Sequence, residues 1–271
     1  MKKIGCIGIG NMGGAVCSAI CRKISGENVL VCDADPVKTA DFQEKYGCKP
    51  ADSCTLADNA DCIVLGIKPQ YMASVLDEIR EVLAKRVDAG ERVVLITMAA
   101  GLTTVWFRET LGLEIPVIRI MPNIPVSVGQ GMIMYTCTAD VTAEEKAAFL
   151  EILSLAGTLD ELPENLIDAG TAVSGCGPAF LCLVLEAMAD GGVACGLPRQ
   201  KALQYAAQTM IGTAETLLET GKHPGVFKDE VTSPGGSTIA GVKAMEDGGV
   251  RAAMMEAVMA AYRRNLELGK K

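Results

Sequence analysis

Residues 229–241, DEVTSPGGSTIAG, place hydroxyl side chains and two glycines directly ahead of an apolar run that begins at Ile239. The pattern predicts the open N-terminus of a helix, whose first backbone N–H groups have no partner within the helix. Such an end binds anions, because those N–H groups donate hydrogen bonds and the helix dipole favours negative charge. The segment is therefore a candidate anion site, and its small or hydroxylated residues are Ser233, Gly235, Gly236, Ser237 and Thr238.

A second candidate site lies near the start of the chain, where an apolar strand at about residues 3–7 precedes a glycine-rich turn and a helical pattern. Gly8 allows the tight turn, Gly10 lets the backbone approach a pyrophosphate, and Gly13 lets the helix pack closely on the strand. Asp33 ends the next strand, NVLVCD, where a carboxylate can accept hydrogen bonds from an adenosine ribose. The pattern predicts a dinucleotide site formed by Gly8, Ile9, Gly10, Asn11, Met12, Gly13 and Asp33.

Further apolar runs predict strands at 61–68, 92–100, 116–123 and 131–136, mostly separated by helical patterns. This alternation is typical of a mostly parallel sheet that is covered by helices on both faces. Ligands of such sheets lie across the carboxyl ends of the strands. Each group that follows a strand is compatible with ordinary turn chemistry, but their shared edge favours one crevice lined by Lys68-Pro69-Gln70, Ala99-Ala100-Gly101 and Met121-Pro122-Asn123.

The second half of the chain predicts helices and almost no strands. The expected helices span 164–194, 198–221, 224–232, 237–247 and 249–268. Many positions between 171 and 218 are small or apolar on more than one helix face, which a thin domain cannot bury within one chain. A homo-oligomer built through these helices is the simplest solution, and the alternative is that the helices cover the sheet. The glycine-rich segment SGCGPAF at 174–180 interrupts this region. It either forms one pocket together with the candidate anion site at 229–241 or marks a helix kink.

Length and charge restrict the function classes. At 271 residues, with 49% of them hydrophobic, the chain can form two domains with a substantial core. The net charge is −8, and no run of Lys or Arg is long enough to follow a nucleic-acid backbone. Gly and Asn interrupt the N-terminal apolar run well short of a signal peptide or a membrane span. We therefore expect a cytoplasmic protein with neither nucleic acid nor membrane as a partner.

Cysteine and histidine provide no convincing catalytic group. The eleven cysteines include no pair with the two-residue gap of metal knuckles. Cys17 and Cys21 share one helical face and could hold a metal, but buried packing in a reducing compartment is favoured, so no metal is predicted. The one histidine, His223, stands at an apparent helix end, where capping by a cationic side chain at a helix C-terminus is favoured over catalysis.

Several segments together resemble the pyrroline-5-carboxylate reductase family. They are IGCIGIGNMG, IKPQ, RIMPNIP, LIDAGTAVSGCGPAF and ETGKHPGVFKDEVTSPGGSTIAGVKAMEDGGVRAAMMEAV, in this order. The resemblance runs from Lys3 to the last helix, and SPGGSTIAGVKAMEDGG is far more specific than the glycine-rich turn. It implies an α/β fold, with a Rossmann-type dinucleotide-binding domain at 1–163 and an all-helical dimerisation and substrate-binding domain at 164–271.

The resemblance also implies a function. Members of the family reduce L-1-pyrroline-5-carboxylate to L-proline with NAD(P)H, the final step of proline biosynthesis, at a site on the interface of a homodimer or higher homo-oligomer. Carried onto this chain, Thr238 is the catalytic contact to the ring nitrogen. The substrate residues are Glu164, Ser233, Gly236, Ser237 and Thr238, and further cofactor residues are Lys68, Pro69, Ala99, Ala100 and Asn123. Cys176 and Ser237 depart from the commoner family pattern without removing a group that the mechanism needs.

Members of the family that the chain resembles commonly use NADPH, and Asp33 argues against that preference here. Its carboxylate would repel an added ribose phosphate, so we expect NADH to be used at least as well as NADPH. Asp35 adds a second negative group, although Asp35-Pro36 is also a good start for a helix. Lys38 is the nearest cation after the strand and could still reach a phosphate.

Two other functions fit parts of the sequence. The β-hydroxyacid dehydrogenases share the glycine-rich turn and a helical second domain, but they need a lysine, and residues 164–197 contain none. A dinucleotide-binding redox sensor without catalysis would have no use for the Ser/Thr-Gly-Gly pocket. Both alternatives are weaker than the reductase.

Overall fold

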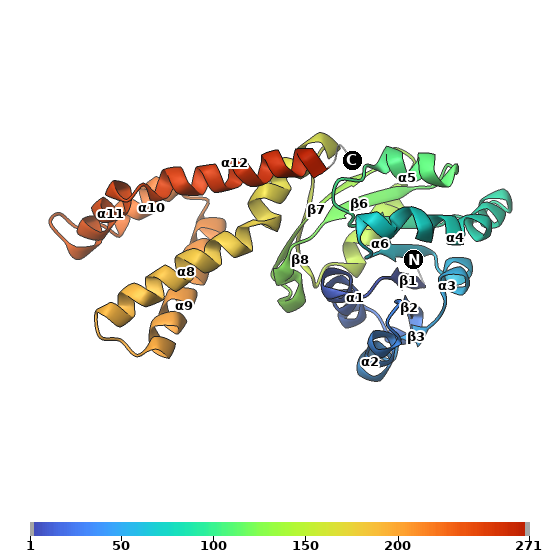
Figure 1. Cartoon of the computed structure of the whole chain (residues 1–271), viewed down its shortest axis with the longest axis horizontal. Coiled ribbons are helices and arrows are strands. Elements are labelled where there is room, and N and C mark those ends of the chain that lie inside the picture. The colour runs from blue at the N-terminus through green and yellow to red at the C-terminus, as the bar shows by residue number, and fades with distance from the viewer. Residues whose placement is uncertain (1–2, 269–271) are drawn as a thin grey trace. The chain divides into compact units, whose positions relative to one another are not determined.

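The structure is a computed structural model that describes residues 3–268 (Figure 1). It divides into two compact units, one that runs to Gly175 and includes the chain from Tyr262, and one formed by Cys176–Ala261. The ends of the expected domains, residues 1–2 and 269–271, lie outside the described residues.

The first unit contains one eight-stranded sheet in the order β3-β2-β1-β4-β5-β6-β7-β8. Every neighbouring pair is parallel except β6 and β7, which are antiparallel. The expected strands and the mostly parallel sheet are confirmed. The strands are β1 (Ile4–Ile7), β2 (Val29–Cys32), β3 (Lys49–Pro50), β4 (Cys62–Leu65), β5 (Val94–Thr97), β6 (Val117–Met121), β7 (Gly131–Cys137) and β8 (Gly157–Glu161).

Two of these strands carried no recognisable signal. β3 has only two residues, one of them proline, and β8 has the polar sequence GTLDE. Both are edge strands, where one side of the strand pairs with nothing and apolar residues are not required. Apolar patterning therefore could not predict them.

Helices pack on both faces of the sheet because alternate residues of each strand face opposite sides. Cys62 and Val64 of β4 belong to the core cluster beneath α1 and α6, whereas Ile63 and Leu65 belong to the cluster beneath α3, α4 and α5. This arrangement explains why the central strands are continuously apolar. The helices are α1 (Asn11–Lys23), α2 (Pro36–Tyr46), α3 (Ser53–Asn59), α4 (Pro69–Asp88), α5 (Thr104–Leu111) and α6 (Ala143–Ile152), with 3₁₀ turns η1 (Gly26–Asn28), η2 (Ile124–Val128) and η3 (Glu164–Leu166).

The expected helix at 164–194 is interrupted, and the interruption lies at the glycine-rich break SGCGPAF that the sequence showed. After η3 comes the short helix α7 (Ile167–Gly170), a single π-helical turn at Thr171–Gly175 and then α8 (Gly177–Ala194). Glycine and proline at the junction explain the interruption, since neither supports a regular helix interior. The other expected helices are present as α9 (Arg199–Thr220), α10 (Pro224–Glu230), α11 (Ser237–Asp247) and α12 (Val250–Leu268).

His223 caps a helix, but not the end that was expected. Gly221 ends α9 in the left-handed conformation, and His223 is the N-cap of α10. Its Nδ1 accepts a hydrogen bond from the Gly225 N–H at 3.1 Å. The side chain therefore caps the start of α10 and not a helix C-terminus.

The helices of the second unit bury little of their apolar surface. Within 176–261 only Ala189, Ala202 and Ala206 are buried, and all three lie on α8 or α9. The segment 164–194 is long and apolar enough to cross a membrane by length and composition, and only 11% of its most apolar stretch is buried. Large exposed apolar side chains of the unit include Leu181, Leu183, Met188, Leu203, Tyr205, Ile211, Met255 and Met259.

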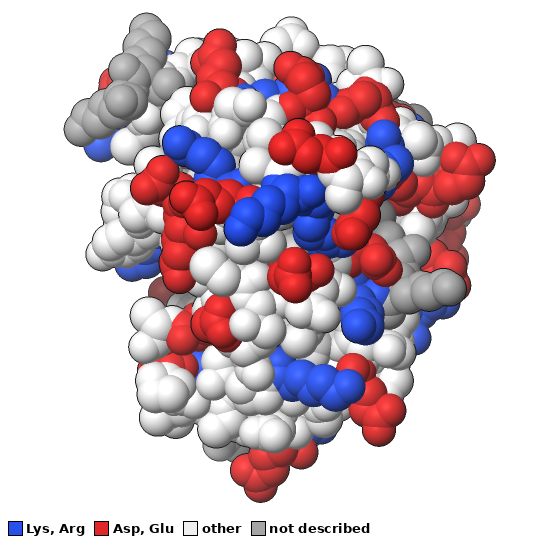
Figure 2. All heavy atoms as spheres, turned by 90° about the vertical axis from the view of Figure 1, so that its right-hand side faces the viewer, with Lys and Arg blue, Asp and Glu red and all other residues white. Residues whose placement is uncertain are grey.

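Charged side chains of both signs are mixed over the face shown in Figure 2. Lysine and arginine side chains there have acidic neighbours, in keeping with the net charge of −8. That face therefore presents no broad basic surface.

Candidate active site

The glycine-rich turn after β1 has the geometry that its spacing predicts. Gly8 has φ +85°, a conformation that favours glycine. A Cβ on Gly13 would lie 2.0 Å from the Gly8 carbonyl oxygen, so only glycine lets α1 approach β1 this closely. A Cβ on Gly10 would meet no atom within 4 Å, which leaves open space beside the turn. Sequence reasoning missed Gly66 after β4, whose Cβ would lie 2.3 Å from the same Gly8 oxygen.

The first turn of α1 is open to an anion. Gly10 is the N-cap, no side chain in the described part of the chain caps it, and the first turn carries no acidic residue. The backbone N–H groups at this end can therefore hold a pyrophosphate, which is the fit that a dinucleotide requires.

A cavity of about 430 Å³ lies between α1 and α2, next to this turn. The cavity combines an open glycine backbone with an aromatic ring, which is the chemistry that an adenosine site needs, and we call it the adenosine cavity. Its lining residues are Ile9, Gly10, Asn11, Gly14, Ser18, Val37, Lys38, Asp41 and Phe42.

The Asp33 carboxylate is held by three donors. Its Oδ2 accepts from the Ile9 N–H at 2.8 Å, and its Oδ1 accepts from the Asp35 N–H at 3.0 Å and from Lys38 Nζ at 3.2 Å. Burial opposes ionisation of the carboxyl, but the bonds from Asp35, Ile9 and Lys38 outweigh it and lower its pKa. The Asp33 side chain is 10% exposed. It is thus an ionised carboxylate that braces the glycine-rich turn.

Asp35 is a helix cap. It is the N-cap of α2, its Oδ1 accepts from the Val37 N–H at 3.0 Å, and Pro36 occupies the first helical position. This confirms the capping interpretation of Asp35-Pro36.

The groups after β4, β5 and β6 lie at one sheet edge, because these strands are parallel neighbours. Lys68 is the N-cap of α4 and Pro69 occupies its first turn. Ala99 is buried, and Ala100 is exposed. These residues have the placement that a cofactor crevice needs, and their contact with a cofactor remains a prediction.

Asn123 is 8% exposed and its amide is already bonded on both sides. Its Oδ1 accepts from the Met132 N–H at 2.9 Å, and its Nδ2 donates to the Ser174 carbonyl at 3.0 Å. Asn123 thereby ties the end of β6 to β7 and to the π-helical turn. Any contact with a cofactor adds to this structural role.

Glu164 is fixed by Thr104 and Arg119. One carboxylate oxygen accepts from the Thr104 N–H at 2.8 Å and the other from Thr104 Oγ1 at 2.9 Å. Arg119 NH1 lies 3.2 Å from Oε1 of Glu164, and Arg119 NH2 lies 3.7 Å from Oδ1 of Asp168. Arg119 is 3% exposed, and within the described chain its Nε has no hydrogen-bond partner. Sequence reasoning missed Thr104 and Arg119, although a charged residue inside the apolar strand PVIRIMPN was a signal.

The segment that precedes α11 forms a turn with an open helix end. The Gly236 N–H donates to the Ser233 carbonyl at 3.0 Å, and Gly235 has φ +71°. A Cβ on Gly236 would lie 2.4 Å from Ser233 Oγ, so a larger residue there would displace the Ser233 hydroxyl from the turn. Gly236 is the N-cap, with no capping bond from any described side chain, and Ser237 begins the helix. Ser233, Ser237 and Thr238 are exposed, which confirms an accessible helix N-terminus.

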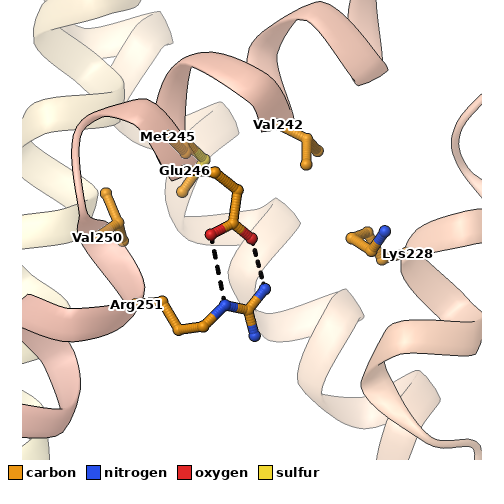
Figure 3. A pocket seen from close by; sticks show the side chains of 6 residues that line it. All are labelled: Lys228, Val242, Met245, Glu246, Val250 and Arg251. Carbon is orange, nitrogen blue, oxygen red and sulfur yellow. Dashed lines mark hydrogen bonds and ion pairs between the residues drawn. The ribbon is translucent and has the colours of Figure 1, made fainter.

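Figure 3 shows a cavity of about 350 Å³ toward the other end of α11. Arg251 NH2 lies 2.5 Å from Oε1 of Glu246, and this ion pair joins α11 to α12. The cavity is lined by Lys228, Val242, Met245, Glu246, Val250 and Arg251, and none of these was a predicted site residue.

Family models match both parts of the chain. The model described as pyrroline-5-carboxylate reductase dimerisation matches residues 164–268. The model described as NADP oxidoreductase, coenzyme F420-dependent, matches residues 3–101. The chain therefore has an N-terminal dinucleotide-binding domain followed by a helical dimerisation domain.

Relatives match over nearly the whole length. The pyrroline-5-carboxylate reductase of Methanosarcina acetivorans is 40% identical over 273 aligned residues, 100% of this chain and 99% of that protein. The Escherichia coli enzyme is 38% identical over 99% of both. A solved pyrroline-5-carboxylate reductase from Coxiella burnetii has a TM-score of 0.89, and one from Plasmodium falciparum with NADP bound has 0.86; each is 30% identical and covers 98% of both chains. The chain belongs to the pyrroline-5-carboxylate reductase family and is an NAD(P)H-dependent oxidoreductase that reduces pyrroline-5-carboxylate to proline.

Proposed function

We propose that the substrate carboxylate binds at the N-terminus of α11, on the turn formed by Ser233, Gly236 and Ser237. The observation that carries this proposal is the exposed helix end, which no side chain among residues 3–268 caps and whose first turn has no acidic residue. A free helix N-terminus attracts a carboxylate through its N–H groups and its dipole. Pyrroline-5-carboxylate has one carboxylate, so this contact orients the ring.

Thr238 is the catalytic contact of the proposal. It occupies the second position of α11, one residue beyond the carboxylate turn, and its side chain is exposed. Its hydroxyl hydrogen-bonds the ring nitrogen while hydride from the dinucleotide adds to the neighbouring carbon. A substrate that arrives as the protonated imine needs no further acid in this step. The residues therefore act by orientation and electrostatics and not as a general acid.

Glu164 completes the substrate site in this proposal, as the family resemblance implies. The bonds from Thr104 and Arg119 support a carboxylate held in one orientation. The cofactor crevice consists of the glycine-rich turn, Asp33 and the strand-end residues Lys68, Pro69, Ala99, Ala100 and Asn123.

The proposal includes use of NADH at least as well as NADPH. The Asp33 carboxylate is ionised and bonds Ile9 and Lys38, which both line the adenosine cavity, so its charge opposes a ribose phosphate there. Lys38, which also lines that cavity, is paired with Asp33, so its charge is partly neutralised before a phosphate could reach it. The Plasmodium relative was solved with NADP, so the preference of this chain needs its own measurement.

The last part of the proposal concerns assembly and location. We place the domain boundary between residues 163 and 164 and assign the exposed apolar helices to the contact between subunits of a homodimer or higher homo-oligomer. The same contact would cover 164–194, which removes the need for a membrane. Eleven free cysteines support a reducing cytoplasm.

One assay tests the reductase activity directly against the two alternatives that the sequence alone left open. NAD(P)H oxidation is measured with pyrroline-5-carboxylate, NAD(P)⁺ reduction with a panel of 3-hydroxyacids, and cofactor binding with neither substrate. The proposal expects NAD(P)H oxidation with pyrroline-5-carboxylate and no NAD(P)⁺ reduction with any of the 3-hydroxyacids. Turnover of the hydroxyacids would favour a β-hydroxyacid dehydrogenase, and cofactor binding without turnover would favour a sensor.

A further inference from the structure

Two cysteines from different elements of the first unit are in direct contact. Cys21 lies in the last turns of α1, and Cys48 lies between Gly47, which ends α2, and β3. Their sulfur atoms are 3.4 Å apart. The proposed reaction uses neither residue.

The two thiols differ in access to solvent. Cys48 is 1% exposed. Cys6 and Cys17, which belong to the same core cluster, are also buried. Cys21 is partly exposed and packs against the edge of the same core cluster. Cys21 is therefore the more accessible of the two residues, and Cys48 is the buried one.

We propose that Cys21 and Cys48 are a thiol–disulfide exchange site for a low-molecular-weight disulfide. The contact of 3.4 Å places the two sulfur atoms close to the separation of about 2.05 Å that a disulfide bond requires. Sequence spacing alone gave no hint of this pair, because the two residues belong to different elements.

The exchange balances without another reagent. Contacts with Cys17 and Cys48, together with burial, raise the pKa of the Cys21 thiol, so the exchange begins when Cys21 loses its proton. Its sulfur then attacks one sulfur of the small disulfide, which forms a mixed disulfide and releases one thiolate. The Cys48 thiolate then attacks the Cys21 sulfur, forms the Cys21–Cys48 bond and releases the second thiolate. The protons lost by Cys21 and Cys48 are taken up by the two released thiolates, so one disulfide is reduced and one is formed.

The bond would join the two helices that wall the adenosine cavity. Cys21 lies on α1, and Cys48 directly follows the end of α2. Residues of both helices line that cavity. The cross-link thus makes the stability of the dinucleotide-binding domain depend on the balance of thiols and disulfides around it.

The test uses the full-length protein and oxidised glutathione. After incubation, free thiols are alkylated and peptides are mapped without reduction. The expected product contains a Cys21–Cys48 link without glutathione on either residue, and its Tm is higher by about 10 °C, which falls back after reduction.

Three variants sharpen the result. Cys48→Ser should retain glutathione on Cys21, because the mixed disulfide has no resolving thiol. Cys21→Ser should leave Cys48 unmodified, because Cys48 is buried. Cys54→Ser is the matched control, since Cys54 is also partly exposed and the link should form normally without it.

The peptide map of the unaltered protein decides the proposal even if a variant folds poorly. The exposed Cys195, which lies beyond the segment 164–194, serves as an internal standard for the reaction. Free Cys21 and Cys48 after Cys195 has taken up glutathione would overturn the proposal. So would a link from Cys17 to either residue in place of the Cys21–Cys48 bond.

Discussion

Arg119 of the central sheet holds Glu164 at the first residue of the dimerisation-family match, with 3.2 Å between Arg119 NH1 and Oε1 of Glu164. The arginine is 3% exposed, so its charge depends on the carboxylates of Glu164 and Asp168 for compensation. Removing one partner of a buried ion pair leaves an uncompensated charge, which costs more than the pair itself contributes. This relationship links the sheet to the segment that leads into the helical domain.

Arg119→Ala should lower the free energy of unfolding by about 3 kcal/mol, because two carboxylates lose their buried partner. Denaturant titration measures the change. Arg80→Ala is the matched control, since Arg80 is an exposed arginine paired with Asp77, and its loss should change stability by less than about 1 kcal/mol. Equal changes in the free energy of unfolding for the two substitutions would show that the buried ion pair stabilises the fold no more than the exposed one.

Thr238→Ala should lower kcat by about 10- to 1000-fold if its hydroxyl contacts the ring nitrogen more strongly as the transition state forms. The affinity for the dinucleotide should hardly change. Steady-state kinetics and cofactor titration together measure both quantities. Thr238→Ser keeps the hydroxyl and should retain much more activity, whereas unchanged turnover of Thr238→Ala would remove Thr238 from the mechanism.

Asp33→Ser should shift the ratio of kcat/KM values toward NADPH by about tenfold, or about 1.4 kcal/mol. The substitution removes a negative charge beside the adenosine cavity and frees Lys38 from its ion pair. Kinetics with both dinucleotides measure the ratio. A wild-type enzyme that favours NADPH by tenfold or more would contradict the proposed role of Asp33.

Asp33 should also contribute to the acid sensitivity of the fold. Its pKa in the folded chain lies below the ordinary value of 3.8, so the carboxylate stabilises the fold above that value and this contribution is lost as the pH falls through the folded pKa. Asp33→Asn should therefore lower Tm at pH 6, and the difference from wild type should shrink below about pH 4. A difference that stays constant with pH would assign the effect to packing and not to charge.

The protein should sediment as at least a dimer at micromolar concentration, because the second unit leaves large apolar side chains such as Leu183 and Met255 exposed. Analytical ultracentrifugation over a dilution series measures the state. A well-folded and active monomer would require another explanation for these apolar faces.

Much of both candidate sites follows from residues that are close together in the sequence. The positive φ of Gly8, the Asp35 cap and the uncapped start of α11 each depend on a few neighbouring residues, whose types restrict the local backbone. The order of apolar strands and helices likewise determines a parallel sheet, because connections of this kind bring the strand ends to one edge. Sequence patterns were therefore sufficient for the fold class and for the glycine-rich turns.

Tertiary structure decided the contacts between residues that are far apart in the sequence. Glu164 is bonded to Thr104 and Arg119, and Cys21 touches Cys48, although no periodic pattern connects the members of either group. The polar edge strand β8 needed a neighbouring strand to define it, since it has no apolar face of its own. Local sequence sets backbone conformation over a few residues, whereas the partner of a buried charge or thiol is set by which elements the folded chain brings together.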